Sequence, residues 1–118
     1  MKIGFKMLIK PLSVNKAWRG GVRYKTKEYK EYKEVIAQYI FVDSSLRNMK
    51  LNLPLEVTYY FYIKNYNRTD VANLEKPLTD ALVDAGLYID DRIIKRIVLE
   101  KFETKGEESI EIIIKPYE

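Results

Sequence analysis

The segment 55–63 constrains the fold more than any other part of the chain. Apolar or aromatic residues stand at 55, 57, 59, 61 and 63, and the residues between them form a second, more mixed face. A period of two residues is typical of a β-strand. The aromatic residues alternate between both faces, which leaves two options open. Either one face makes a dimer contact, or one face is core and the other is covered by helices.

Periodicity elsewhere predicts two helices and further strands. The order is β(β)αβαββ, an α+β class with a mostly antiparallel sheet and two helices packed on it, in a single domain over residues 1–118. The predicted strands other than 55–63 cover residues 3–9, 22–24, 93–102 and 110–114, and the predicted helices cover residues 27–40 and about 74–85.

Capping and breaking residues define the helix ends. Thr26 precedes the first helix and is its predicted N-cap. Pro77 is tolerated only in a first turn, so the second helix begins near residues 73–75 with Asn73 as its N-cap. Gly86 ends that helix as a left-handed cap.

Two residue types are missing from the chain, and their absence excludes much chemistry. The sequence has no cysteine and no histidine. Disulfides, thiol nucleophiles, histidine bases and nearly all zinc or copper sites are therefore excluded. A bound metal must take oxygen ligands, which favours Mg²⁺, Mn²⁺ or Ca²⁺. A catalytic proton must move through a carboxylate, lysine, tyrosine or metal-bound water.

Charge is distributed unevenly. The net charge is +4, but residues 1–33 carry ten Lys/Arg against two Asp/Glu, a local charge of +8. Such a basic end indicates a polyanionic partner, or else a solvated lysine face. No apolar run is long enough to span a membrane, and the first residues do not resemble a signal peptide. We expect a cytoplasmic protein without a membrane partner.

Polar residues gather around the predicted second helix. Asp70 precedes it, Asn73 and Lys76 stand near its start, and Asp90 and Asp91 follow it. If the chain returns to the start of the helix, the carboxylates of Asp70, Asp90 and Asp91 converge around Lys76. Converging carboxylates repel each other unless a cation lies between them, which suggests a metal site.

Structural interpretations of the same residues stay open. Asp70 can cap the helix, Asp90 and Asp91 can be turn residues, and Lys76 can be an ordinary surface lysine. Asp80 and Asp84 lie off the apolar stripe and are expected to be solvated.

Two motifs in the right order resemble the RusA family of Holliday junction resolvases. The resemblance covers residues 6–114. The opening motif P-x-S-x-N-x-x-[WY] occupies residues 11–18. The second motif, D-x-x-N-x-x-K-x-x-x-D-A-L followed by G and D-D, consists of Asp70, Asn73, Lys76, Asp80, Ala81, Leu82, Gly86, Asp90 and Asp91.

The resemblance implies a homodimeric, bacterial or phage-encoded endonuclease that cuts four-way DNA junctions symmetrically in recombination and repair, using Mg²⁺ or Mn²⁺. Its metal-binding acids would be Asp70, position 72 and Asp91, with Asp90 beside them. Asp70, Asp91 and Lys76 would be catalytic. A metal on the carboxylates would activate water, and Lys76 would stabilise charge on the phosphate.

Position 72 departs from the family pattern D-x-D-N. Ala72 has no metal-binding side chain, and losing one of three carboxylates weakens a cation site. We expect a chain that binds junctions but cleaves them poorly or not at all. An engineered replacement of an aspartate is favoured over natural loss because the surrounding motif is intact.

The basic end supplies the expected DNA contacts. Trp18 either stacks on an exposed base or packs on the sheet. Two alternatives to the nuclease remain, a non-catalytic branched-DNA-binding protein and a small dimer whose acidic cluster holds Ca²⁺ or is merely solvated. The predicted DNA-binding residues are Lys10, Asn15, Lys16, Trp18, Arg19, Arg23, Lys25, Lys27, Arg68 and Lys76.

Overall fold

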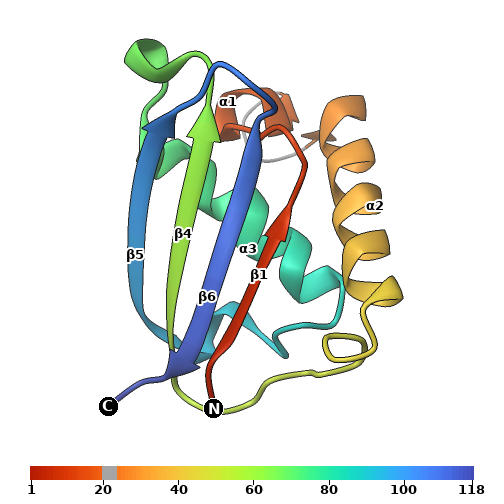
Figure 1. The fold of residues 1–118 in the computed structure, drawn as a ribbon. Coiled ribbons are helices and arrows are strands. Elements are labelled where there is room, and N and C mark those ends of the chain that lie inside the picture. Colours follow the sequence, from red (N-terminus) through yellow and green to blue (C-terminus); the bar gives the residue numbers. More distant parts are fainter. Residues whose placement is uncertain (20–23) are drawn as a thin grey trace.

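One four-stranded sheet organises the protein in the computed structural model, which describes residues 1–19 and 24–118 (Figure 1). Its order is β1–β6–β4–β5. Strand β6 is antiparallel to both of its neighbours, whereas β4 and β5 are parallel. The predicted α+β class is confirmed, with a mixed sheet. The strands are β1 (Ile3–Met7), β4 (Leu55–Ile63), β5 (Ile94–Glu103) and β6 (Ser109–Pro116).

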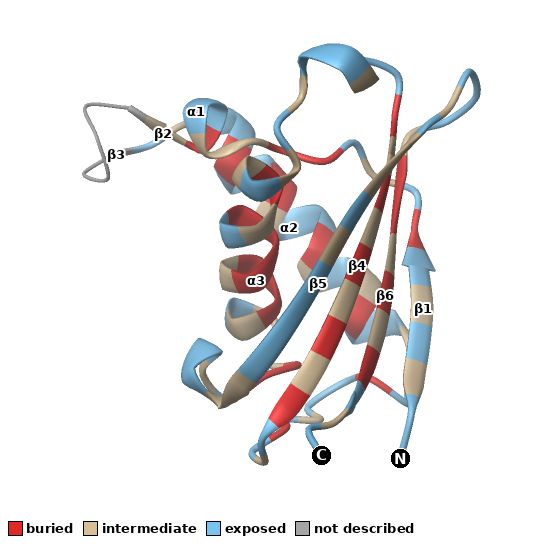
Figure 2. Ribbon diagram, turned by 90° about the vertical axis from the view of Figure 1, so that its left-hand side faces the viewer, coloured by how far each residue is buried: buried red, intermediate tan, exposed pale blue. Residues whose placement is uncertain are grey.

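Both main helices, α2 (Lys27–Val42) and α3 (Glu75–Asp84), cover the same face of the sheet. Along β4, buried residues alternate with half-buried ones (Figure 2), and the hydroxyl of the buried Tyr59 reaches Thr79 of α3. The predicted period of two is therefore confirmed. The opposite face is covered by no helix among the residues that the structure describes. None of the described helices is long and apolar enough to cross a membrane.

Helix α2 begins as the sequence predicts. The Thr26 hydroxyl accepts a hydrogen bond from the Tyr29 backbone N–H at 3.2 Å, satisfying a donor that the first helical turn leaves free. The predicted apolar stripe is buried at Tyr29, Tyr32, Ile36 and Ile40.

The predicted cap of the second helix is wrong. A 3-10 helix, η2 (Val71–Leu74), precedes α3, and Asp70 caps it by accepting the Ala72 N–H. Asn73 lies inside η2, so it is not a cap. The added turn shifts the capping site three residues upstream, while Pro77 still falls in the first turn of α3. Gly86 has φ of 85° and is the predicted left-handed residue.

Several short elements complete the chain. Helix α1 occupies part of a segment predicted as loop, and the predicted strand 22–24 falls largely outside the described residues. The short elements are α1 (Val14–Ala17), β2 (Trp18–Arg19), β3 (Tyr24–Lys25), η1 (Tyr66–Arg68) and η3 (Asp91–Ile93).

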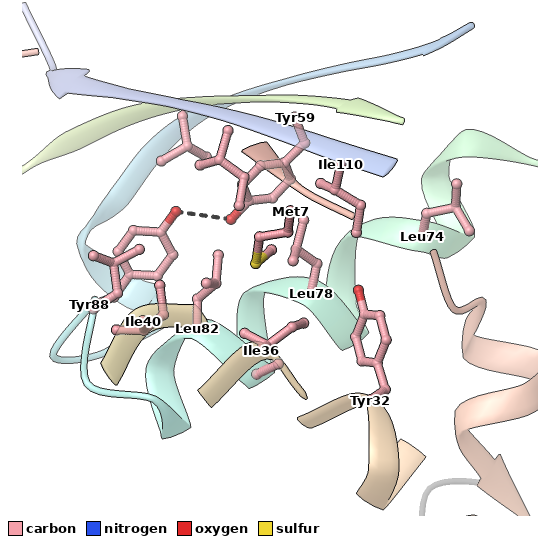
Figure 3. Close-up of a cluster of buried hydrophobic side chains, with 14 of the residues drawn as sticks. Met7, Tyr32, Ile36, Ile40, Tyr59, Leu74, Leu78, Leu82, Tyr88 and Ile110 are labelled. Atoms are coloured by element: carbon pink, nitrogen blue, oxygen red, sulfur yellow. Dashed lines mark hydrogen bonds between the residues drawn. The ribbon is translucent and has the colours of Figure 1, made fainter. Parts of the chain in front are cut away.

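A buried polar network joins α3 to the sheet. The Tyr59 hydroxyl on β4 lies 3.0 Å from the Thr79 hydroxyl and 3.1 Å from the Tyr88 hydroxyl (Figure 3). The Thr79 hydroxyl donates to the Glu75 carboxylate at 2.6 Å. Three hydroxyls are thereby satisfied inside an apolar core, where unpaired ones would destabilise the fold.

We expect Thr79→Val to lower the free energy of unfolding by about 1–2 kcal/mol, because Glu75 and Tyr59 lose a buried partner. Urea denaturation measures this. Thr58→Val, on the open face of β4, is the matched control and should change stability by less than about 0.5 kcal/mol. Equal effects from the two substitutions would contradict the network's role.

Candidate nucleic-acid interface

A cleft of about 480 Å³ opens at the end of β4, where α1, α2 and the segment 65–74 meet. Its polar lining comes from segments that are far apart in the sequence. Predicted site residues that line it are Lys10, Asn15, Lys16, Arg68 and Asp70, and Ser13, Thr69 and Asn73 stand beside them. The fold therefore brings part of the first motif and the start of the second motif, Asp70 and Asn73, into one cleft.

Helix α1 places the first motif. Ala17 is buried, while Asn15 and Lys16 are exposed. The Thr26 hydroxyl donates to the Lys16 carbonyl at 2.6 Å, and the Thr26 N–H donates to the Ala17 carbonyl at 3.0 Å. Thr26 thus caps α2 and anchors α1, which ties the first motif to the start of α2.

Asp70 stands exposed at the cleft. Its carboxylate accepts the Ala72 N–H at 3.1 Å, so the structural interpretation of Asp70 as a cap is correct, though for η2 rather than α3. The same contact places residue 72 next to the Asp70 carboxylate. Ala72 is exposed, so a larger side chain there needs no rearrangement of the core.

Lys101 holds the loop that carries Arg68 and Asp70, and sequence reasoning missed it. Its ammonium donates to the Tyr66 carbonyl at 2.7 Å and the Thr69 carbonyl at 2.9 Å, and it lies 4.3 Å from the centre of the Tyr66 ring. Lys101 interrupts a period-two apolar series on β5 after Ile97 and Leu99, and this interruption is the signal that could have revealed it.

Lys76 does not line the cleft. It lies on the first turn of α3, with 55% of its side chain exposed, and pairs with Asp80 at 3.3 Å. Asp84 pairs with Lys33 of α2 at 2.6 Å. Asp80 and Asp84 lie off the buried stripe of α3, and each also forms an ion pair, Asp80 within α3 and Asp84 with the neighbouring helix.

The remaining basic residues lie around the start of α2. Trp18 packs edge-on against Tyr29, with ring centroids 4.9 Å apart, rather than on the sheet. Lys25 and Lys27 are exposed. The neighbouring ammonium of Lys33 lowers the pKa of Lys25. Arg23 lies outside the described residues, and only the backbone of Arg19 is among them.

Asp90 and Asp91 do not converge with Asp70. Residue 94 pairs with Leu55 and Glu103 pairs with Ile63 in the parallel register, so Asp91 lies at the start of β4 and Asp70 lies beyond its end (Figure 1). The predicted convergence within one chain is wrong because the chain does not return to the start of α3. It enters β5 at the opposite end.

Asp90 is engaged locally. Its two carboxylate oxygens accept from Arg92 Nε at 3.1 Å and Nη2 at 3.2 Å, and the Arg92 backbone N–H adds a bond of 2.8 Å. These bonds, led by that from the Arg92 side chain, lower the pKa of Asp90 to about 2. Asp90 caps η3, in agreement with its interpretation as a turn residue.

The acidic residues of one chain do not fit a divalent metal. Within residues 1–19 and 24–118, no three acidic side chains gather in a way that could hold an ion. Of the predicted metal-binding residues, only Asp70 lines the cleft. Ala72 has no side-chain oxygen, and both carboxylate oxygens of Asp90 are hydrogen-bonded to the Arg92 side chain. A single chain therefore does not offer a three-carboxylate metal site among its described residues.

We expect Lys101→Met to speed amide hydrogen exchange in segment 66–70 by about tenfold, because two loop carbonyls lose their donor. Lys95→Met on the same strand removes the same charge from an exposed site and should leave that segment unchanged. Unaltered exchange in Lys101→Met would contradict the anchoring role.

The comparisons with known proteins agree with the motif resemblance. Residues 10–115 match the family described as Endodeoxyribonuclease RusA, a span that includes the cleft, both main helices and strands β4 and β5. None of the curated proteins compared with the chain matches it. Since the match covers nearly the whole chain, the protein belongs to the RusA endodeoxyribonuclease family.

Proposed function

We propose that this chain binds four-way DNA junctions through the cleft at Asp70 and cleaves them poorly or not at all. Family membership supports the substrate class. The observation that carries the proposal is that Lys10, Lys16 and Arg68 line the same cleft as Asp70, next to an N-terminal segment, residues 1–33, with a local charge of +8; Glu28, Glu31 and Glu108 also line the cleft. Cationic side chains around a concave surface attract phosphates, and such binding weakens as salt rises.

Weak cleavage follows from the carboxylates. RusA nucleases generally depend on a divalent metal. Bound Mg²⁺ or Mn²⁺ would generate hydroxide from water near neutral pH. Of the acids predicted to bind metal, one chain places only Asp70 at the cleft, and no three acidic side chains gather among the described residues, which is too few protein oxygens for a firm site. Lys76, half-exposed on α3, is proposed to stabilise charge on the phosphate.

A restored aspartate tests this proposal. Ala72→Asp adds a second carboxylate two residues from Asp70, whose own carboxylate accepts the residue-72 N–H at 3.1 Å. With Mn²⁺ and a synthetic four-way junction, we expect the variant to cut at least about 100-fold faster than the unsubstituted chain. Both should bind the junction more tightly than a linear duplex of the same length.

Asn67→Asp is the matched control, since it adds the same charge to the same exposed loop without altering the set next to Asp70. Binding by both chains with cleavage by neither would favour the alternative, a non-catalytic branched-DNA-binding protein. Rapid cutting by the unsubstituted chain would contradict the weakened site.

The proposed roles of Asp91 and of a homodimer depend on each other. Asp91 and Asp70 lie at opposite ends of α3, so Asp91 can act at the cleft only if a second copy supplies it. A two-fold dimer also presents two identical sites to the paired strands of a junction. We therefore propose that Asp91 of one copy meets Asp70 of the other.

Mixing two inactive variants tests this arrangement. In the Ala72→Asp background, Asp70→Asn and Asp91→Asn should each be inactive alone. After subunit exchange, an equal mixture should regain about a quarter of the intact sites and produce single nicks, because each mixed dimer holds one complete site. Persistent inactivity of a mixture shown to exchange subunits would contradict the shared site.

A further inference from the structure

Strand β5 leaves one edge of the sheet open. It stands last in the strand order and is ten residues long, and none of the described residues pairs with its outer side (Figure 1). Ile97 and Val98, in the middle of this strand, are 39% and 40% exposed. A long edge strand with exposed apolar residues offers its unpaired backbone groups to another strand.

The opposite edge of the sheet is less suited to pairing. Strand β1 has only five residues, and just beyond its end the Leu8 N–H already donates to the Tyr39 hydroxyl of α2 at 3.0 Å. A short edge beside a helix gives little room for a further strand. Of the two edges, β5 is therefore the one that an added strand would join.

The sequence of β5 is complementary to itself. A two-fold axis normal to the sheet maps each face onto itself, so antiparallel copies of β5 pair residues of the same face. With the axis at Val98, Ile97 of the helix-covered face meets Leu99 of a second copy. On the open face, Arg96 meets Glu100 of the second copy. Symmetry doubles both contacts, which gives two apolar pairs and two pairs of opposite charge.

Neighbouring registers lack this match. With the axis at Leu99, Ile97 would meet Lys101 of the second copy. With the axis at Ile97, Val98 would meet Arg96. Each of these registers sets an apolar side chain opposite a charged one, so the register centred on Val98 is the most favourable.

The charged groups on this edge can form the proposed pairs. Glu100 is exposed and forms no ion pair among the described residues. Arg96 binds the Glu56 carboxylate through one nitrogen at 2.8 Å, which leaves its other nitrogens for a second carboxylate. Lys95 and Lys101 would also stand opposite each other, but each ammonium donates to a backbone carbonyl of its own chain.

We propose that two copies of this chain join by antiparallel pairing of their β5 edges, with the two-fold axis at Val98. The inference rests on the proposed homodimer and names its interface. Antiparallel pairing sets the start of one β5 beside the end of the other. Asp91 lies in η3, just before β5, and Lys101 near the end of β5 holds the loop that leads to Asp70. The pairing therefore brings Asp91 of one copy to the end of the sheet where Asp70 of the other lies.

The same axis turns both clefts toward one side of the dimer. Because it is normal to the sheet, it keeps the helices of both copies on the same side, and α1 and α2 contribute to the cleft. Packing the two open sheet faces against each other would turn the clefts away from each other. A single branched DNA can reach two sites at once only when they face the same way, which favours pairing through the edge.

The chain has no cysteine, so a single introduced thiol reports the interface directly. In Val98→Cys, the two thiols stand on the axis, where facing Cα atoms of an antiparallel pair are about 4.5–5.5 Å apart, within disulfide range. Mild oxidation without DNA, read on a non-reducing gel, should give at least about tenfold more covalent dimer than Val42→Cys, a more exposed position on α2 that reports chance collision.

Thr58→Cys is the matched control for the register. Thr58 pairs with Val98 one strand further into the sheet, so the two copies of this residue would lie three strand spacings apart, about 14 Å, too far for a disulfide. It should form no more covalent dimer than Val42→Cys. Cross-linking through Thr58 in place of Val98 would indicate that the open faces pack together and would overturn the β5 interface.

Glu100→Arg turns both proposed ion pairs into repulsions. It should raise the dissociation constant of the dimer at least about tenfold in sedimentation experiments. Glu34→Arg, the same charge change at an exposed position of α2, should leave that constant unchanged. Equal constants for the two variants, or Val98→Cys dimer at the level of chance collision, overturn the interface. Neither readout uses DNA, so failure of an intact Val98→Cys dimer to bind junctions overturns the proposed function alone.

Discussion

Parallel pairing of β4 with β5 determines where the polar groups of the family motif lie. Parallel neighbours require a crossover, and α3 provides it, so the chain leaves β4 at one end of the sheet and enters β5 at the other. A nine-residue strand is about 30 Å long. Asp70 and Asp91 are therefore separated by roughly the length of β4. A single chain therefore does not bring these two acids together.

The cleft is held in shape by side chains that do not line it. Loop carbonyls near the surface need donors, and two distant residues supply them. Thr26 satisfies the Lys16 carbonyl, and Lys101 satisfies the Tyr66 and Thr69 carbonyls. Each ties one wall of the cleft to a main element, α2 or β5. These hydrogen bonds therefore fix the backbone that carries the basic side chains of the cleft.

Periodicity and capping predict the parts of this fold whose causes are local. Strand β4 and helix α2 follow from repeats of two and 3.6 residues, and Thr26 and Gly86 act where the sequence places them. The two family motifs also predict several residues that line the cleft, because members of the family share the spacing of these residues along the chain. The position of Asp91 depends on whether the chain crosses the sheet, and the role of Lys101 depends on strand register. No local pattern carries that information.

Ala72 and Tyr32 differ in how a polar side chain at each position affects the stability of the fold. Residue 72 is exposed, and its contact with the Asp70 carboxylate is made by the backbone N–H. A carboxylate on its side chain is therefore not needed for the stability of the fold. The Tyr32 hydroxyl is the opposite case, since phenylalanine would fill the same space without burying an unpaired group.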